Sequence, residues 1–198
     1  MTRIISGVAG GVRLEVPASG TRPTSDRVRE SLFAALDSAE MIEGARVLDL
    51  YAGSGALGLE ALSRGAISAD FVERARPAAA IIRRNIAQFT TALRSANLPT
   101  LATHVHETAA VTYLKRGNGT FDLVFSDPPY DISDHALTAD LVALTPLLAP
   151  DAIVVIERAR RSSAPDFASA GLVELRDRSY GDTRVWWAEP ASDTVTEL

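Results

Sequence analysis

From residue 45 onward, short apolar runs alternate with longer stretches whose apolar residues recur at helical spacing. Short apolar runs between turn residues predict strands buried on both faces of a sheet. The expected strands are Arg46–Leu50, Ala69–Val72, Leu101–Val105, Phe121–Ser126 and Ala152–Glu157. The expected helices are Ala56–Arg64, Pro77–Leu93, Thr108–Arg116 and His135–Leu148. This alternation predicts an α/β fold with a doubly wound, mostly parallel sheet and right-handed crossovers.

The pattern changes near the C-terminus. Two strand-like segments, Leu172–Tyr180 and Thr183–Ala188, are joined through Gly181 and Asp182. Glycine beside aspartate between two strands is typical of a tight turn, so we expect an antiparallel hairpin that closes one edge of the sheet. Residues 191–198 form the predicted loose tail.

The N-terminal segment has a third pattern. Between Ile4 and Val16, apolar residues are interleaved with glycines, which predicts a hairpin or short strands. Residues 17–23 are expected to form a loop, and Thr24 is expected to cap a helix. The apolar face of that helix comprises Val28, Leu32, Phe33 and Leu36. We therefore expect an N-terminal hairpin and helix over residues 1–36, followed by the main domain over residues 37–190.

The composition supports one folded unit. The 198 residues are 46% hydrophobic and 23% charged, which is enough for one sizeable core. The longest stretch without charged residues, 95–106, is not apolar, and the N-terminus has no apolar block, so we expect neither a transmembrane helix nor a signal peptide. The absence of cysteine excludes disulfides and favours a cytoplasmic protein. The three histidines, His104, His106 and His135, lack metal-ligand spacing, so no metal is expected.

The charge is unevenly distributed. The chain has 20 basic and 25 acidic residues, a net charge of −5, which excludes a general polyanion binder. Residues 1–36 nevertheless carry five arginines against three acids, a net charge of +2, which leaves −7 for the rest. The arginines are Arg3, Arg13, Arg22, Arg27 and Arg29. They are candidates for phosphate contacts in a nucleic acid, although a solvated helix face and an exposed hairpin would explain them as well.

A second basic cluster follows the fifth expected strand. It comprises Arg158, Arg160 and Arg161 and should lie near the same rim of the sheet. These arginines would either extend a nucleic-acid surface or simply be solvated.

A glycine loop follows the first strand of the main domain. Gly53, Gly55 and Gly58 form a G-x-G-x-x-G pattern between strand and helix. Glycines at such a turn let a ligand approach the backbone, and the helix N-terminus offers free N–H groups. Glu73, at the end of the second strand and 20 residues after Gly53, can accept hydrogen bonds from both hydroxyls of an adenosine ribose. The combination predicts a nucleoside cofactor.

Asp49 helps to distinguish between cofactors, because it ends the strand before the glycines. Its carboxylate would repel the pyrophosphate of a dinucleotide. It would attract the ammonium and sulfonium groups of S-adenosylmethionine, which the sequence therefore favours. The alternative is that Asp49 only caps the turn.

The fourth strand runs into Asp127-Pro128-Pro129-Tyr130. Two consecutive prolines fix an extended, rigid turn, which should lie beside the glycine loop at the carboxyl edge of the sheet. An aromatic exocyclic amine has two N–H groups, which Asp127 and the Pro128 carbonyl could accept, while Tyr130 offers a face for a flipped-out base. The turn therefore predicts methylation of such an amine by positioning, without a covalent intermediate. Whether Asp127 also takes a proton is open, because loss of the proton to water would serve as well.

Three blocks of sequence together resemble one family. They are Arg3–Gly7 with Arg22–Phe33, then Leu48–Gly55, and then Asp127–Tyr130. With them the chain resembles the class I (Rossmann-like) S-adenosylmethionine-dependent methyltransferases and, more narrowly, the bacterial 16S rRNA guanine-N2 methyltransferases of the D type. Many amino-methyltransferases, including DNA adenine enzymes, share the last two blocks, so the first block narrows the resemblance.

The resemblance implies a seven-stranded sheet with an N-terminal β-hairpin extension. It implies methyl transfer to N2 of one specific guanine of 16S rRNA, in a partly assembled small subunit rather than free RNA, by a monomer. Cofactor positions match Asp49, Tyr51, Gly53, Gly55 and Glu73, and catalytic positions match Asp127, Pro128, Pro129 and Tyr130. The chain departs from the common pattern after the third strand, where Glu107 or Thr108, followed by Ala109, replaces the usual Asp or Asn that reads the adenine.

Three other interpretations account for part of the pattern. An adenine-N6 methyltransferase on DNA or RNA would use the same Asp-Pro-Pro-Tyr turn, although the chain has no separate target-recognition domain for a DNA site. A nicotinamide-dependent oxidoreductase would explain Gly53 to Gly58 but neither Asp49 nor the Asp127 turn. A non-catalytic ribosome-assembly factor would not need both a cofactor site and a catalytic turn.

Overall fold

The computed structural model describes residues 2–17 and 26–192. Its strands are β1 (Thr2–Arg3), β2 (Arg13–Leu14), β3 (Arg46–Leu50), β4 (Ser68–Val72), β5 (Ala102–His106), β6 (Phe121–Ser126), β7 (Leu148–Ala159), β8 (Leu172–Tyr180) and β9 (Thr183–Pro190). Its helices are α1 (Asp26–Ser38), α2 (Ala56–Ser63), α3 (Arg76–Ser95), α4 (Ala110–Arg116) and α5 (Asp134–Leu144), with short 3₁₀ helices at Thr145–Leu147 and Ala168–Ala170.

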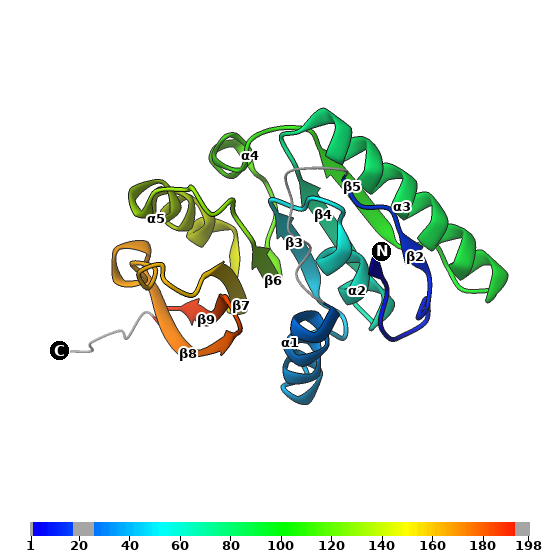
Figure 1. Ribbon diagram of the computed structural model, residues 1–198, viewed down its shortest axis with the longest axis horizontal. Helices are drawn as coiled ribbons and strands as arrows, with labels where there is room; N and C mark the ends of the chain where they lie inside the picture. The colour runs from blue at the N-terminus through cyan, green and yellow to red at the C-terminus, as the bar shows by residue number, and fades with distance from the viewer. Residues whose placement is uncertain (1, 18–25, 193–198) are drawn as a thin grey trace.

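One seven-stranded sheet organises the molecule, with strand order β5-β4-β3-β6-β7-β9-β8 (Figure 1). The strands from β5 to β7 are parallel, and β9 and β8 continue the sheet as an antiparallel hairpin. The order reverses at β3, whose two neighbours are β4 and β6. This is the switch point at which open α/β sheets bind ligands. The predicted parallel sheet with its terminal hairpin is confirmed.

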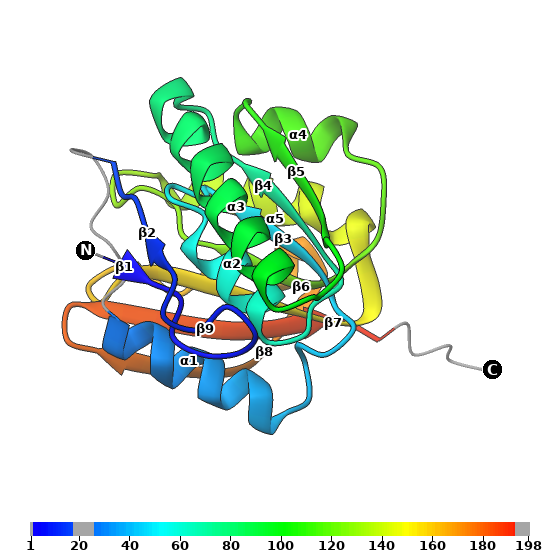
Figure 2. The same cartoon turned by 90° about the vertical axis from the view of Figure 1, so that its right-hand side faces the viewer.

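Helices cover both faces of the sheet. In Figure 2, α1, α2 and α3 lie in front of the sheet, and α4 and α5 lie behind it. Alternate residues of the central strands enter the two cores: Val47 and Phe125 face the first three helices, and Leu48 and Val124 face the other two. Strands buried on both faces are the reason that the apolar runs had little polar alternation.

Most expected boundaries in the main domain differ from the observed ones by no more than two residues, but two differ by four. The helix expected to reach Leu148 ends at Leu144, where a 3₁₀ turn containing Pro146 follows, because proline lacks the N–H that would continue the helix. The last parallel strand begins at Leu148 rather than Ala152. Of the extra residues, Leu148 pairs with Phe121, and the register then shifts before Ile153 pairs with Leu123, so Pro150 lies in the irregularity and is tolerated there.

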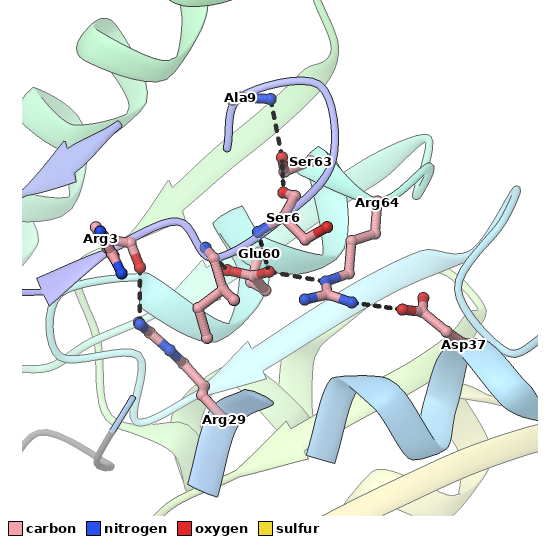
Figure 3. Close-up of polar contacts among 9 residues, drawn as sticks. Arg3, Ser6, Ala9, Arg29, Asp37, Glu60, Ser63 and Arg64 are labelled. Carbon is pink, nitrogen blue, oxygen red and sulfur yellow. Dashed lines mark hydrogen bonds and ion pairs between the residues drawn. The ribbon is translucent and has the colours of Figure 1, made fainter. Parts of the chain in front are cut away.

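The N-terminal hairpin is much shorter than expected, with two residues in each strand, and the segment is fastened to α2. Figure 3 shows the buried Glu60 of α2 as the anchor. Its carboxylate accepts backbone hydrogen bonds from Ile5 (2.6 Å) and Ser6 (3.1 Å) and a third from Arg64 Nε (2.7 Å). Residues 2–17 therefore share a core with the sheet.

Ser63 provides a second anchor one turn further along α2. Its hydroxyl donates to the carbonyl of Ser6 (2.6 Å) and accepts from the amide of Ala9 (3.0 Å) (Figure 3). Gly7, with φ +82°, passes so close that a Cβ there would lie 1.8 Å from the Ser63 carbonyl oxygen. Only glycine fits this contact. The predicted helix cap, Thr24, lies outside the described residues.

Candidate active site at the switch point

A cleft of about 670 Å³ opens at the carboxyl ends of β3 and β6. This volume is in the usual range for sites that bind small molecules. Ten of the predicted cofactor and catalytic residues line it: Asp49, Tyr51, Gly53, Glu73, Thr108, Ala109, Asp127, Pro128, Pro129 and Tyr130. The structure thus brings together the two motifs that lie about 70 residues apart in the sequence, as parallel neighbouring strands require.

Asp49 lies at the floor of the cleft, where only 1% of it is exposed. Its Oδ2 accepts a hydrogen bond from the amide of Gly58 (2.9 Å), so the carboxyl group also fixes the first turn of α2. Burial raises the pKa of Asp49 to about 8, while the Gly58 hydrogen bond opposes that shift. Asp49 therefore anchors the helix, the role that the alternative interpretation gave it, and it also lines the cleft, where a bound cation would favour its charged form.

The glycine loop is held to the next strand by Glu73. Glu73 Oε2 accepts from the amide of Gly53 (3.0 Å), and Oε1 accepts from the amide of Ala75 (2.7 Å). Each carboxylate oxygen has a further lone pair, so both can still accept ribose hydroxyls. Gly55 adopts a left-handed conformation (φ +77°) as the N-cap of α2, which explains why glycine is needed there.

Gly58 and Tyr51 have structural roles that the motif alone did not reveal. A Cβ at Gly58 would lie 2.5 Å from the ring of Phe71, so this third glycine permits close packing of α2 on β4. The Tyr51 hydroxyl donates to Asp140 Oδ2, which ties the loop to α5. Burial and the Asp140 hydrogen bond raise the pKa of Tyr51, so it stays a neutral donor.

The segment after β5 places one of the two candidates for the adenine contact at the cleft. Thr108 lines the cleft, and its amide donates to the carbonyl of His106 (3.0 Å). Glu107 instead pairs with Arg83 on α3 (3.1 Å). Of the two residues, Thr108 is therefore the one placed at the cleft, with Ala109 as the N-cap of α4 beside it.

The Asp127–Tyr130 turn is rigid for reasons beyond its two prolines. Pro128 is buried and Tyr130 is 47% exposed. The Pro129 carbonyl accepts from the amide of Ile132 (3.0 Å), which closes the turn. Arg158 of β7 then donates to the Ile132 carbonyl (3.3 Å) and to Asp134 (2.8 Å).

Arg158 is 5% exposed, so it is a brace under the turn rather than the solvated or RNA-contacting residue that the sequence suggested. Sequence reasoning also missed Asn85, Glu60 and Asp140. Glu60 and Asn85 left a signal, because each is a polar residue on the apolar face of its helix.

The predicted RNA-contacting arginines divide into three groups. Arg3, Arg13 and Arg27 are exposed, and Arg22 lies outside the described residues. Arg29 is 1% exposed, and its Nη2 donates to the carbonyl of Arg3 (2.7 Å) (Figure 3). A phosphate contact needs an accessible guanidinium, so the prediction is wrong for Arg29, which fastens the hairpin to α1.

Comparisons with known proteins agree with this geometry. A family model described as "Conserved hypothetical protein 95" matches residues 2–189. The chain is 38% identical over 164 residues to ribosomal RNA small subunit methyltransferase D of Escherichia coli K12, a match that covers 82% of this chain and 77% of that protein. The chain belongs to this methyltransferase family. The same-named protein of Haemophilus influenzae is 34% identical over 158 residues, covering 78% of this chain and 77% of that one.

Solved structures extend the likeness to the whole fold. The Escherichia coli protein yhhF superposes with a TM-score of 0.73 at 32% identity, over 96% of this chain and 97% of that chain. A protein of a Thermus species gives a TM-score of 0.78 at 30% identity, over 96% of this chain and 99% of that chain. These matches confirm the predicted class I methyltransferase fold.

S-adenosylmethionine is the methyl donor of class I methyltransferases, and the cleft fits it. Glu73 offers carboxylate oxygens for a ribose, and the buried Asp49 offers a counter-charge for the ammonium and sulfonium groups. Residues 2–17 and 26–192 contain no cluster of three or more His, Cys, Asp or Glu side chains able to hold a metal. Within the same ranges, no helix is long and apolar enough to cross a bilayer.

Proposed function

We propose that this protein is an rRNA methyltransferase that moves a methyl group from S-adenosylmethionine to the N2 amine of one specific guanine in 16S rRNA. The observation that carries the proposal is the shared cleft, in which Asp49 and Glu73 lie on one side of the switch point and Asp127 to Tyr130 lie on the other. The relatives named ribosomal RNA small subunit methyltransferase D support an rRNA substrate. The proposal includes a cytoplasmic monomer acting on a partly assembled small subunit.

The chain's own residues do their work by positioning. When bound, S-adenosylmethionine supplies a methyl group on a sulfonium. Asp127 accepts one N–H of the target amine and the Pro128 carbonyl accepts the other, which aims the nitrogen lone pair along the line of transfer. Tyr130, exposed at the mouth, stacks on the flipped base. After transfer the nitrogen loses one proton to water or to Asp127.

The first test is transfer of tritiated methyl from S-adenosylmethionine to small-subunit particles from cells that lack this protein, followed by nucleoside analysis. N2-methylguanosine is the expected product. Labelled N6-methyladenosine would show instead that the substrate is an adenine amine, which the Asp-Pro-Pro-Tyr turn could also bind. Label on neither base would contradict the proposal, provided that calorimetry shows cofactor binding.

A variant of the turn separates binding from catalysis. Asp127→Ala should bind S-adenosylmethionine within a few-fold of the wild type and lose roughly 100-fold or more in turnover, because an aligned acceptor for the amine is gone. Turnover at the wild-type rate would remove Asp127 from the catalytic role.

The exposed N-terminal arginines are proposed to contact phosphates. Replacing Arg3, Arg13 and Arg27 with Ala should weaken particle binding and reduce its salt dependence, by about 0.7 in the log–log slope for each phosphate that is no longer neutralised. Binding that is insensitive to salt in the wild type would exclude this role.

A further inference from the structure

A second hollow, of about 640 Å³, adjoins the catalytic turn. It is lined by Tyr130, Ala159, Arg160, Arg161 and Asp182. Tyr130 lines both this hollow and the cofactor cleft, so the two spaces meet at this residue. The adjacency follows from the sheet: β7 pairs with β6 in parallel, with Ile156 opposite Ser126, so the residues after β7 emerge beside the Asp127 turn.

The two arginines occupy a fixed turn. The amide of Ser162 donates to the carbonyl of Ala159 (2.8 Å), which places Arg160 and Arg161 at the corner positions. The amide of Arg160 also donates to the carbonyl of Asp182 (2.7 Å) in the turn between β8 and β9. The backbone beneath both side chains is therefore held from two directions, so a ligand need not order a loop before it binds.

The hollow has an excess of positive charge. It contains two exposed guanidiniums and one carboxylate, that of Asp182. Some exposed arginines elsewhere have an acidic partner, as Arg84 has Glu15 and Arg184 has Asp177. Among residues 2–17 and 26–192, neither Arg160 nor Arg161 forms such an ion pair. A bound anion would neutralise this excess of positive charge.

We propose that this hollow, the Arg160–Arg161 pocket, binds a phosphodiester of the substrate RNA next to the target nucleotide. The inference rests on the proposed function. A base that stacks on Tyr130 with its amine at Asp127 leaves its sugar and phosphates outside the cleft, on the side that Tyr130 shares with the pocket. Guanidinium groups suit this partner, because they donate two parallel hydrogen bonds to phosphate oxygens. The contact fixes the register of the RNA relative to the methyl donor.

The test compares two double variants of equal charge. Arg160→Ala with Arg161→Ala removes the pocket's cations. Arg94→Ala with Arg116→Ala removes two exposed cations at the C-terminal ends of α3 and α4, which lead into the N-terminal ends of β5 and β6. Both are assayed by methyl transfer to small-subunit particles at several salt concentrations, with calorimetry of S-adenosylmethionine binding as the check on folding.

We expect the pocket variant to raise the KM for particles about tenfold or more, and to reduce the log–log salt slope by about 1.4, corresponding to two single-stranded phosphate contacts. The affinity for S-adenosylmethionine should not change. Arg160→Lys with Arg161→Lys should restore the slope, since lysine keeps the charge, but not all of the affinity.

A pocket variant that matches the Arg94 and Arg116 control in KM and slope would overturn the inference while leaving the proposed function intact. A wild-type protein that binds the cofactor but transfers no methyl to particles would overturn the proposed function, and the inference with it. The two failures are therefore distinguishable.

Discussion

The side-chain amide of Asn85 takes the place of a strand partner for Glu15. Its Oδ1 accepts from the amide of Glu15 (2.8 Å), and its Nδ2 donates to the carbonyl of the same residue (2.9 Å). The second Nδ2 proton goes to the carbonyl of Ser54 (2.9 Å), in the glycine loop. One fully buried amide on α3 thus joins the N-terminal segment to the cofactor loop. Val16 and Pro17, the next residues of that segment, line the cofactor cleft.

Asn85→Ala should therefore destabilise the fold and weaken cofactor binding together. Loss of the amide leaves backbone groups of Glu15 and Ser54 without partners, at a cost of about 2–3 kcal/mol. Gln88→Ala is the matched control. Gln88 lies on the same helix, but its side chain makes only a long, exposed hydrogen bond of 3.5 Å to the Glu15 carboxylate. Urea unfolding and calorimetry with S-adenosylmethionine measure both effects. Equal behaviour of the two variants would contradict the coupling.

Gly7→Ala and Gly11→Ala separate backbone strain from steric contact. Both glycines have positive φ, +82° and +88°, so both substitutions carry a left-handed strain of about 1–2 kcal/mol. Only Gly7 faces the Ser63 carbonyl oxygen, whereas a Cβ at Gly11 has open space. Thermal unfolding should show that Gly11→Ala lowers the free energy of unfolding modestly. Gly7→Ala should lower it by roughly 2 kcal/mol more, or by a larger amount. Similar losses would mean that the segment is not seated on α2 as described.

Arg158→Ala should lower turnover without changing cofactor affinity. The guanidinium braces Ile132 and Asp134, just beyond the catalytic turn, and small displacements of reacting groups are costly to rate. We expect kcat to fall about tenfold or more, with the S-adenosylmethionine Kd within twofold. Arg184→Ala, which breaks an exposed pair with Asp177, is the control and should leave kcat unchanged. A parallel fall of kcat in both variants would assign no special role to Arg158.

The protonation of Asp49 gives a pH prediction. Burial raises the pKa of Asp49 to about 8. Between the ordinary aspartate pKa and pH 8, the carboxyl group is therefore protonated in the folded protein without ligand and ionised in the unfolded chain. The group's contribution to stability is therefore greatest below the ordinary aspartate pKa and is lost as the pH rises through about 8. A bound cation favours the carboxylate, so binding of S-adenosylmethionine should release a proton below that pH, and affinity should rise with pH up to about 8.

Calorimetry at neutral pH in two buffers of different ionisation enthalpy measures that proton. On binding S-adenosylmethionine, the wild type should release about one proton from the Asp49 carboxyl, and the Asp49→Asn variant should release almost none. Asn can still accept the Gly58 amide, so the variant keeps the anchor while losing the charge. Equal proton release in the two proteins would exclude Asp49 as the titrating group.

The parts of the site that a strand carries directly were predictable from the sequence. Asp49 and the Asp127 turn each follow an apolar run, and parallel strands place their carboxyl ends at one edge. The brace and the anchors were not predictable, because they join residues far apart in the chain. Arg29 and Arg158 look like surface arginines in sequence, and only the packing of α1 and β7 buries them. The ends of elements were missed where a proline or a register shift intervened, as at Pro146 and Phe121.

The long-range anchoring of residues 2–17 has a consequence for biosynthesis. These residues are synthesised before their partners, because Glu60 and Asn85 lie 55 and 70 positions further along the chain. At about 5–20 residues per second, Glu15 waits about 4–14 s before Asn85 has even been added. The N-terminal segment thus docks only after α2 and α3 have been synthesised, and a nascent chain that ends before Asn85 cannot complete the support of the cofactor loop.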